Sequence, residues 1–170
     1  MSLKRFFCNT KGLIYHYIDN TIHKFWVSYY LSKFILNFKT DKKTAIKLLR
    51  RSIVHDLSKY SWSEAKHFMK VVCCMKNHTY LGEEYQRDLE ILKPALAHHY
   101  ERNSHHPQFY DGTVSQMSQL DQIEMLCDWL ASVRKHSDGN IFKSIEANQD
   151  RFKYDDKTKR AYRVIVTTIL

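Results

Sequence analysis

Four of the ten histidines in this chain of 170 residues fall within the nine residues "HHYERNSHH". They are His98, His99, His105 and His106. Imidazole binds divalent metals and also carries protons near neutral pH. Alone, the stretch would fit an accidental metal-binding segment or a solvated loop, so its interpretation depends on what the rest of the chain supplies.

A second stretch, "VHDLSKY", contains His55 and Asp56 next to each other, with Lys59 three residues further on. An adjacent His-Asp pair offers a neutral nitrogen and an anionic oxygen from a single stretch of helix, which suits a borderline divalent ion. The ammonium of Lys59 could hold a phosphate oxygen. The alternative is a surface salt bridge between Asp56 and Lys59, which would contribute little to stability.

Three acids lie close together in the segment 115–136, where we expect a helix. Asp121, Glu124 and Asp128 share one sector beside its apolar arc. Carboxylates at the margin of a buried face need partners, and this helix has no basic residue before Arg134. Histidines, or a metal held by histidines, are therefore the expected partners, and Asp121 is expected to face water.

The segment 13–38 provides one more histidine. His16, Asn20 and His23 fall on one side of the expected helix, because steps of four and three residues keep nearly the same direction. We interpret His16 as an ordinary helix-face residue. His23 lies at the margin of an apolar stripe, from which a side chain can reach a site inside a helix bundle.

The composition predicts an all-α fold, because Gly (4) and Pro (2) are scarce and 44% of the residues are hydrophobic. We expect a single-domain helical bundle over residues 1–170, with a core at about 13–136 and C-terminal helices at about 141–168. The expected helices are 13–38, 41–57 capped by Thr40 or Asp41, 62–76 after a capping box at Ser61 and Glu64, 83–102 kinked at Pro94, 115–136, 141–151 and 156–168.

The spacing of apolar residues predicts which helix faces are buried. On the first helix the residues at three- and four-residue spacing are Ile14, Tyr17, Ile18, Ile22, Phe25, Trp26, Tyr29 and Tyr30. On the second helix they are Ala45, Ile46, Leu48, Leu49, Ile53 and Leu57. On the helix 115–136 they are Leu120, Ile123, Leu126, Cys127, Leu130 and Val133.

The charge of +9 is concentrated near the start of the chain. Residues 1–51 hold eleven Lys and Arg against two acids, and the remainder is balanced. A basic face attracts polyanions such as nucleotides, nucleic acid or an anionic membrane. No apolar run approaches the roughly 20 residues of a membrane span, so we predict no membrane partner. The four cysteines form no C-x-x-C pair, which favours reduced thiols and a cytoplasmic location.

The order of these groups, His … His-Asp-x-x-Lys … His-His … Asp/Glu, resembles the HD-domain superfamily of metal-dependent phosphohydrolases. "HDLSK" is similar to the His-Asp-x-Gly-Lys form of several branches, and "HHYERN" is similar to the His-His-Glu segment of the cyclic-dinucleotide phosphodiesterases. With "IEMLCDWLA", these stretches look closest to an uncharacterised HD-like family of phages and large viruses. The resemblance covers residues 16–135 and implies an all-helical fold.

The resemblance also implies a divalent metal site of one or two ions. The implied ligands are His23, His55, Asp56 and Asp128, with His98 and His99 for a second ion. The last ligand is ambiguous, because "IEMLCDWL" resembles a nucleotidase stretch that would select Glu124 instead of Asp128. Imidazole and carboxylate ligands admit Mn, Fe, Co, Ni or Zn.

The implied activity is hydrolysis of a phosphate ester by a metal-activated water. The residues expected to act on the substrate are Lys59, Glu124, His105 and His106. Lys59 and a histidine of the loop would neutralise phosphoryl oxygens, and Glu124 or a loop histidine would protonate the leaving oxygen. The expected substrate is a small phosphorylated anion, by default a nucleotide. The alternatives are an HD-fold di-iron oxygenase and a non-catalytic basic module that binds nucleic acid.

Overall fold

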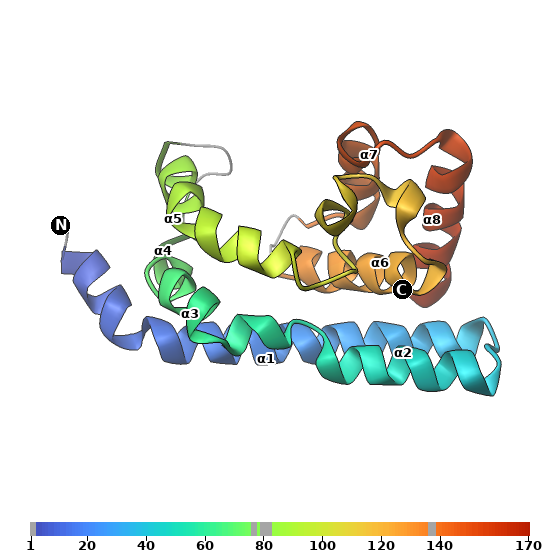
Figure 1. The fold of residues 1–170 in the computed structure, drawn as a ribbon, viewed down its shortest axis with the longest axis horizontal. Helices are drawn as coiled ribbons and strands as arrows, with labels where there is room; N and C mark the ends of the chain where they lie inside the picture. The colour runs from blue at the N-terminus through green and yellow to red at the C-terminus, as the bar shows by residue number, and fades with distance from the viewer. Residues whose placement is uncertain (1–2, 76–77, 79–82, 136–138) are drawn as a thin grey trace. The chain divides into compact units, whose positions relative to one another are not determined.

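The structure is a computed structural model that describes residues 3–75, 78, 83–135 and 139–170, without the side chains of 3–10, 74 and 75. The described residues are mainly helical and contain no strand, which confirms the all-α prediction (Figure 1). The elements are α1 (Leu3–Asn37), α2 (Lys42–Val54), η1 (Leu57–Tyr60), α3 (Trp62–Phe68), α4 (Val72–Met75), α5 (Glu83–Tyr100), η2 (Pro107–Tyr110), η3 (Val114–Gln116), α6 (Gln119–Val133), α7 (Ile141–Phe152) and α8 (Asp156–Ile169).

The chain divides into two compact units. Unit 1 comprises residues 1–22 and 56–102, and unit 2 comprises residues 23–55 and 103–170. Helix α1 is continuous and contributes to both, and the boundary falls between His55 and Asp56. The expected single domain over 1–170 stays a prediction.

Unit 1 is built on the packing of α3 against α5. Its buried apolar residues include Ala65, Val71, Leu92 and Ala95. The beginning of α1 approaches the backbone after α3 so closely that a Cβ atom at Gly12 would lie 1.9 Å from the carbonyl oxygen of Met69. Glycine is therefore the residue that fits this position.

Unit 2 is organised around α6, which contacts α2, α7 and α8. Helix α6 begins with a capping box, in which the Ser118 hydroxyl accepts from the Asp121 amide and the Asp121 carboxylate accepts from the Ser118 amide. Its apolar arc lies in the core as predicted. Leu126, Cys127 and Leu130 are fully buried there.

Helix α2 ends earlier than the sequence predicts. Asp41 caps its start as expected, accepting from the amides of Lys43 and Thr44. The helix stops at Val54, because His55 has a ψ of 126° and Asp56 adopts the left-handed conformation with φ of 54°. The prediction that the His-Asp pair lies on a helix is therefore wrong, and the pair lies on the turn that follows α2.

Other helix ends also differ from the predictions. Ser61 precedes α3, but its side chain makes no capping bond, so the predicted capping box is wrong. The predicted helix 62–76 is interrupted between α3 and α4. Helix α5 includes Pro94, and α6 begins at Gln119 after a separate 3₁₀ turn. The predicted end of that helix, His136, lies outside the described residues.

The predicted buried faces of α1 and α2 are largely wrong. The apolar residues that the structure places in solvent are Ile14, Ile18, Ile22, Phe25, Tyr29, Ile46, Leu49, Ile53 and Leu57. The core side of α2 is formed by Leu48 with the smaller Ser52, and that of α1 in unit 2 includes Val27 and Leu31. Both helices of unit 2 therefore present apolar residues outward as well as inward.

Two smaller expectations concern thiols and membranes. Cys73 and Cys127 are free thiols, as predicted, and the side chains of Cys8 and Cys74 lie outside the described part of the structure. Among the described residues, no helix is both long and apolar enough to cross a membrane.

The core of unit 2 predicts the effect of a cavity. Leu126 is completely buried, so Leu126→Ala should lower the free energy of unfolding by about 3 kcal/mol through lost contacts and residual space. Val164 on α8 is exposed, and Val164→Ala should change it by less than about 0.5 kcal/mol. Urea unfolding monitored by circular dichroism measures both, and equal effects of the two substitutions would contradict the assigned core.

Candidate metal centre

Three buried side chains of unit 2 form the centre of the site. His23 comes from α1, His55 from the C-cap of α2, and Asp128 from α6. Each offers one potential ligand atom, and these atoms lie within 4.8 Å of one another. His23 Nε2 is 2.8 Å from Asp128 Oδ1, and His55 Nε2 is 3.9 Å from the same oxygen. The structure therefore brings together three of the four residues predicted for the first metal.

Glu124 occupies a different position from Asp128. Its Oε1 atom lies 2.8 Å from His55 Nδ1 and 3.3 Å from His105 Nδ1. His55 thus directs one ring nitrogen to Glu124 and the other toward Asp128. A carboxylate that accepts from Nδ1–H fixes the ring and directs the Nε2 lone pair outward, which is a common arrangement around metal-binding histidines.

The second oxygen of Glu124 is held by an arginine of α2. Arg51 Nε donates to Glu124 Oε2 at 2.5 Å, and its Nη2 donates to Asp121. Asp121 also accepts from the hydroxyls of Ser104 and Tyr110. Asp121 is buried, so the expectation that it faces water is wrong. The cation that pairs with Asp121 is Arg51 of α2. The prediction considered basic residues on α6 alone and therefore did not identify this partner.

The electrostatics of the centre favour an ionised Asp128. Burial raises the pKa of this carboxyl, but the hydrogen bond with His23 and the charges of His23, His106 and His55 outweigh burial and hold the pKa well below its usual range. Burial, together with the charges of Glu124 and Asp128, raises the pKa of Cys127 well above its usual value. Cys127 is therefore a thiol, and the anionic donors here are carboxylates.

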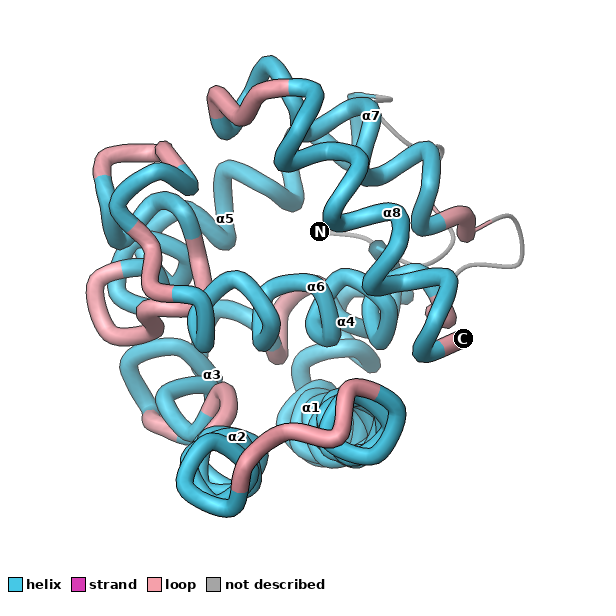
Figure 2. The backbone as a smooth tube through the Cα atoms, turned by 90° about the vertical axis from the view of Figure 1, so that its right-hand side faces the viewer, coloured by secondary structure: helices cyan, strands magenta, loops and turns pink. Residues whose placement is uncertain are grey.

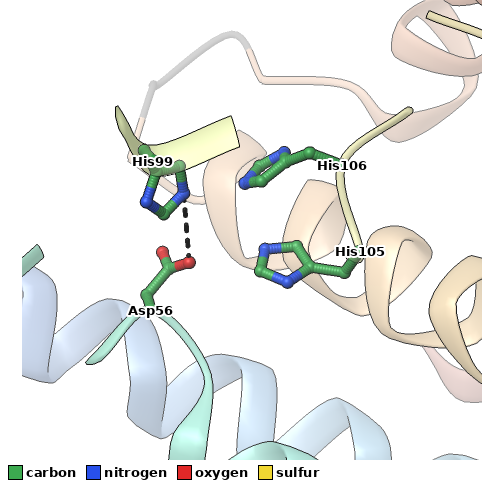
Figure 3. Close-up of side chains that lie close together, drawn as sticks. All are labelled: Asp56, His99, His105 and His106. Carbon is green, nitrogen blue, oxygen red and sulfur yellow. Dashed lines mark ion pairs between the residues drawn. The ribbon is translucent and has the colours of Figure 1, made fainter. Parts of the chain in front are cut away.

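His105 and His106 follow α5 and precede Pro107, as predicted from the sequence. Figure 3 shows them on one stretch of chain, and their rings lie 4.2 Å apart between centroids. The His105 ring is also 4.4 Å from that of His55. Within unit 2, the loop after α5 thus places the buried His105 ring next to both His55 and Glu124.

The donor set of unit 2 fits a divalent ion. Two imidazoles and a carboxylate suit Zn²⁺ and other borderline ions. In a tetrahedral site with bonds of about 2.1 Å, ligand atoms are roughly 3.4 Å apart, a spacing that atoms within 4.8 Å of one another can reach with small side-chain adjustments. The potential ligand atoms of His55, His105 and Glu124 also lie within 4.8 Å of one another.

Unit 1 contains its own buried cluster around Asp56. The Asp56 carboxylate lies 2.6 Å from Lys59 Nζ and 3.3 Å from His99 Nε2 (Figure 3). Asp56 is completely buried. The salt bridge with Lys59 that the sequence allowed is thus present, but its carboxylate is buried and its ammonium is partly buried, so it is not a surface pair.

Glu64 is the main residue of unit 1 that the sequence analysis missed as a site residue. Its Oε1 lies 2.7 Å from His98 Nδ1, and its Oε2 lies 3.1 Å from His99 Nδ1. The Ser-x-x-Glu pattern predicted a capping box at Glu64. It gives no indication that this carboxylate has partners on α5. His98 and His99 therefore hold a carboxylate between them, and His99 contacts carboxylates through both ring nitrogens.

These contacts shift the pKa values of the pair in opposite directions. Burial and the charge of Lys59 lower the pKa of His99, but its hydrogen bonds to Asp56 and Glu64 prevail and raise it above 6.5. Burial raises the pKa of Glu64, but hydrogen bonds with His99 and His98 prevail and lower it below 4.5. Both shifts favour the charged forms of His99 and Glu64, which attract each other inside unit 1.

Two further predicted positions are buried on α1. His16 Nε2 lies 2.8 Å from the Lys59 carbonyl oxygen, and the His16 ring stacks on Phe68 at 4.8 Å. This supports the interpretation of His16 as a structural residue. Asn20, on the same side of α1, is also buried.

Comparison with protein families matches residues 15–170 to DUF5662, described as a family of unknown function. The chain belongs to this family. The family covers the segments that carry both clusters, from His16 to Asp128. Comparisons with the curated proteins and with the solved structures found no match.

Removing Arg51 should destabilise unit 2. Arg51→Met would leave the buried carboxylates of Asp121 and Glu124 without their cation, and we expect a loss of about 3 kcal/mol in the free energy of unfolding. Arg50→Met is the matched control, because Arg50 is the exposed neighbour on the same helix. Urea unfolding at pH 7 measures the free energy of unfolding of both variants. If Arg51→Met lowered it as little as Arg50→Met, Arg51 would not neutralise this site.

The ion pair of His99 and Glu64 predicts a pH dependence of stability. A raised His99 pKa stabilises the fold below pH 6.5 and loses this effect as pH rises through the shifted value. A lowered Glu64 pKa stabilises it above pH 4.5 and loses this effect on acidification. Glu64→Gln should therefore cost more free energy of unfolding near pH 5.5 than at pH 8.5.

The measurement is urea unfolding of the metal-free protein across this range. Glu90→Gln is the matched control, because Glu90 pairs with Lys93 on the exposed side of α5. A cost of Glu64→Gln that does not vary with pH would contradict the proposed charge states.

Proposed function

We propose that this protein is a metal-dependent phosphohydrolase whose metal site lies in unit 2. The observation that carries the proposal is the buried group of His23, His55 and Asp128. Burying two imidazoles and a carboxylate together is costly unless they bind one another or an ion. Their order in the chain also resembles that of the HD-domain phosphohydrolases.

His23 Nε2, His55 Nε2 and an Asp128 oxygen would hold the ion. A divalent ion bound by such donors polarises phosphoryl oxygens and lowers the pKa of water. Glu124 would orient the His55 ring through Nδ1, and Arg51 holds the Glu124 carboxylate in place. Asp128 is the better candidate for the carboxylate ligand, because Glu124 already contacts both Arg51 and His55.

His105 and His106 are the proposed proton carriers of the reaction. His105 Nδ1 lies 3.3 Å from Glu124 Oε1, so a proton can pass between this imidazole and the carboxylate. His106 is partly buried, and its charge lowers the pKa of Asp128, which places it close to the metal site. An imidazolium here would offset the negative charge of phosphoryl oxygens.

The proposed substrate is a small phosphorylated anion, with nucleotides as the first class to test. Residues 1–51 carry eleven Lys and Arg against two acids, and such an excess raises the local concentration of anions. The other roles expected from the sequence stay predictions. They are Asp56 as a metal ligand, Lys59 as a phosphate contact, and His98 and His99 as ligands of a second ion.

Metal analysis of the purified protein tests the proposal. The wild type should retain about one equivalent of a divalent ion, and His23→Ala and Asp128→Asn should abolish retention. Glu124→Gln should weaken metal affinity about 10- to 100-fold, since it fixes a ligand without being one. His67→Ala is the control, because His67 bonds a backbone carbonyl in unit 1 and should not change metal content.

Hydrolysis is then measured with nucleotides and with nitrophenyl mono- and diesters, with Mn²⁺, Fe²⁺, Co²⁺, Ni²⁺ or Zn²⁺ supplied. Turnover should disappear in Asp128→Asn and persist in His67→Ala. A metal-free wild type that resists reconstitution, or turnover that survives Asp128→Asn, would rule out the proposed site. Asp56→Asn in the same assays tests the predicted fourth ligand.

A further inference from the structure

The outer face of α1 and α2 in unit 2 is apolar and exposed. Phe25, Leu36 and Ile53 are 62%, 74% and 70% exposed. Tyr29 and Leu49 are also exposed, and the residues on each helix are spaced four or seven apart, which keeps side chains on one side of a helix. Monomeric proteins rarely expose a long apolar face that binds nothing.

The two helices present this face as a hairpin. They run antiparallel through the turn after Asn37, and Figure 2 shows them side by side, nearly end-on. Lys24 Nζ donates to the Ile53 carbonyl oxygen at 2.9 Å, which fixes the end of α2 against α1. The exposed apolar side chains of both helices are therefore carried by adjacent helices within unit 2.

The charge beside the apolar stripe of α2 identifies the kind of partner. Lys43, Lys47 and Arg50 are exposed and follow the same helical spacing. Lys43 lies three residues before Ile46, Lys47 directly follows Ile46, and Arg50 directly follows Leu49. A stripe of basic residues therefore runs along α2 beside the apolar stripe. Residues 23–55 hold eight Lys and Arg and a single acid, Asp41. The partner must therefore be both apolar and anionic.

A second copy of this chain does not meet this requirement, because it would bring an equally basic face. Nucleic acid would meet the basic stripe and could stack on Phe25 and Tyr29, but the aliphatic Leu36, Leu49 and Ile53 have no ring to stack on bases. An anionic bilayer meets both requirements, since aliphatic and aromatic side chains enter its interfacial region while Lys and Arg stems extend to phosphates.

We propose that the outer face of α1 and α2 binds an anionic lipid membrane surface. Phe25, Leu36 and Ile53 enter the headgroup and acyl boundary, and Lys43, Lys47 and Arg50 contact lipid phosphates. The protein then lies on the bilayer without spanning it. The prediction of no membrane partner rested on the lack of a spanning segment, which surface binding does not need. The proposed phosphohydrolase activity is not required for this binding.

Co-sedimentation with vesicles tests the proposal on the full chain. The wild type should bind phosphatidylcholine vesicles that contain about 30 mol % phosphatidylserine, and bind pure phosphatidylcholine at least about tenfold more weakly. The apolar variant Phe25→Ser/Leu36→Ser/Ile53→Ser and the charge variant Lys43→Gln/Lys47→Gln/Arg50→Gln should each reduce the partition coefficient at least about tenfold. Val164→Ser is the control, because Val164 is 62% exposed on α8.

Circular dichroism and metal content verify that the variants fold. The proposal is overturned if the wild type does not bind the anionic vesicles, or if binding survives the apolar variant. A second result would also overturn it: the wild type does not bind vesicles and is a dimer, and only the apolar variant dissociates that dimer. Binding to a DNA duplex at the wild-type level in the apolar variant, without vesicle binding, would identify a polyanion site instead.

Discussion

The site in unit 2 depends on the ion pairs of Arg51 with Asp121 and Glu124. Buried carboxylates are expensive, and α6 places both of these acids beside its apolar arc. The guanidinium contacts one oxygen of each, so it neutralises them and fixes their orientation together. Because Glu124 is held in this way, its other oxygen can orient His55, and Asp128 remains the carboxylate beside His23.

The turn after α2 has a similar influence on the chain. The non-helical backbone of His55 and the left-handed backbone of Asp56 end the helix, and the two side chains then join different compact units. In unit 2, His55 contacts Glu124. In unit 1, Asp56 contacts Lys59 and His99. A dipeptide that looks like one bidentate motif in the sequence therefore contributes to two buried polar clusters.

Helix content was predictable, because it depends on local spacing. The order of motifs, through its resemblance to a known superfamily, pointed to His23, His55 and Asp128, which the structure brings together. Periodicity located α1, α2, α5 and α6, and the wheel of α6 placed Glu124 and Asp128 beside the core. Partners on other helices were not predictable in this way. Nothing near Ser61 indicates that Glu64 bonds to His98 and His99, and nothing on α6 indicates Arg51. These pairings depend on helix packing, which single-sequence periodicity does not determine.

The error in the buried faces of α1 and α2 has a physical explanation. A helix with apolar residues on two opposite sides gives a strong three- and four-residue repeat, but the repeat cannot distinguish the side that meets the core. On α1, His23 and Val27 face inward while Phe25 and Tyr29 face outward. The core needs only one of these faces. The retention of large apolar side chains on the other, beside lysines and arginines, is what a membrane-facing surface requires and what solubility alone would disfavour.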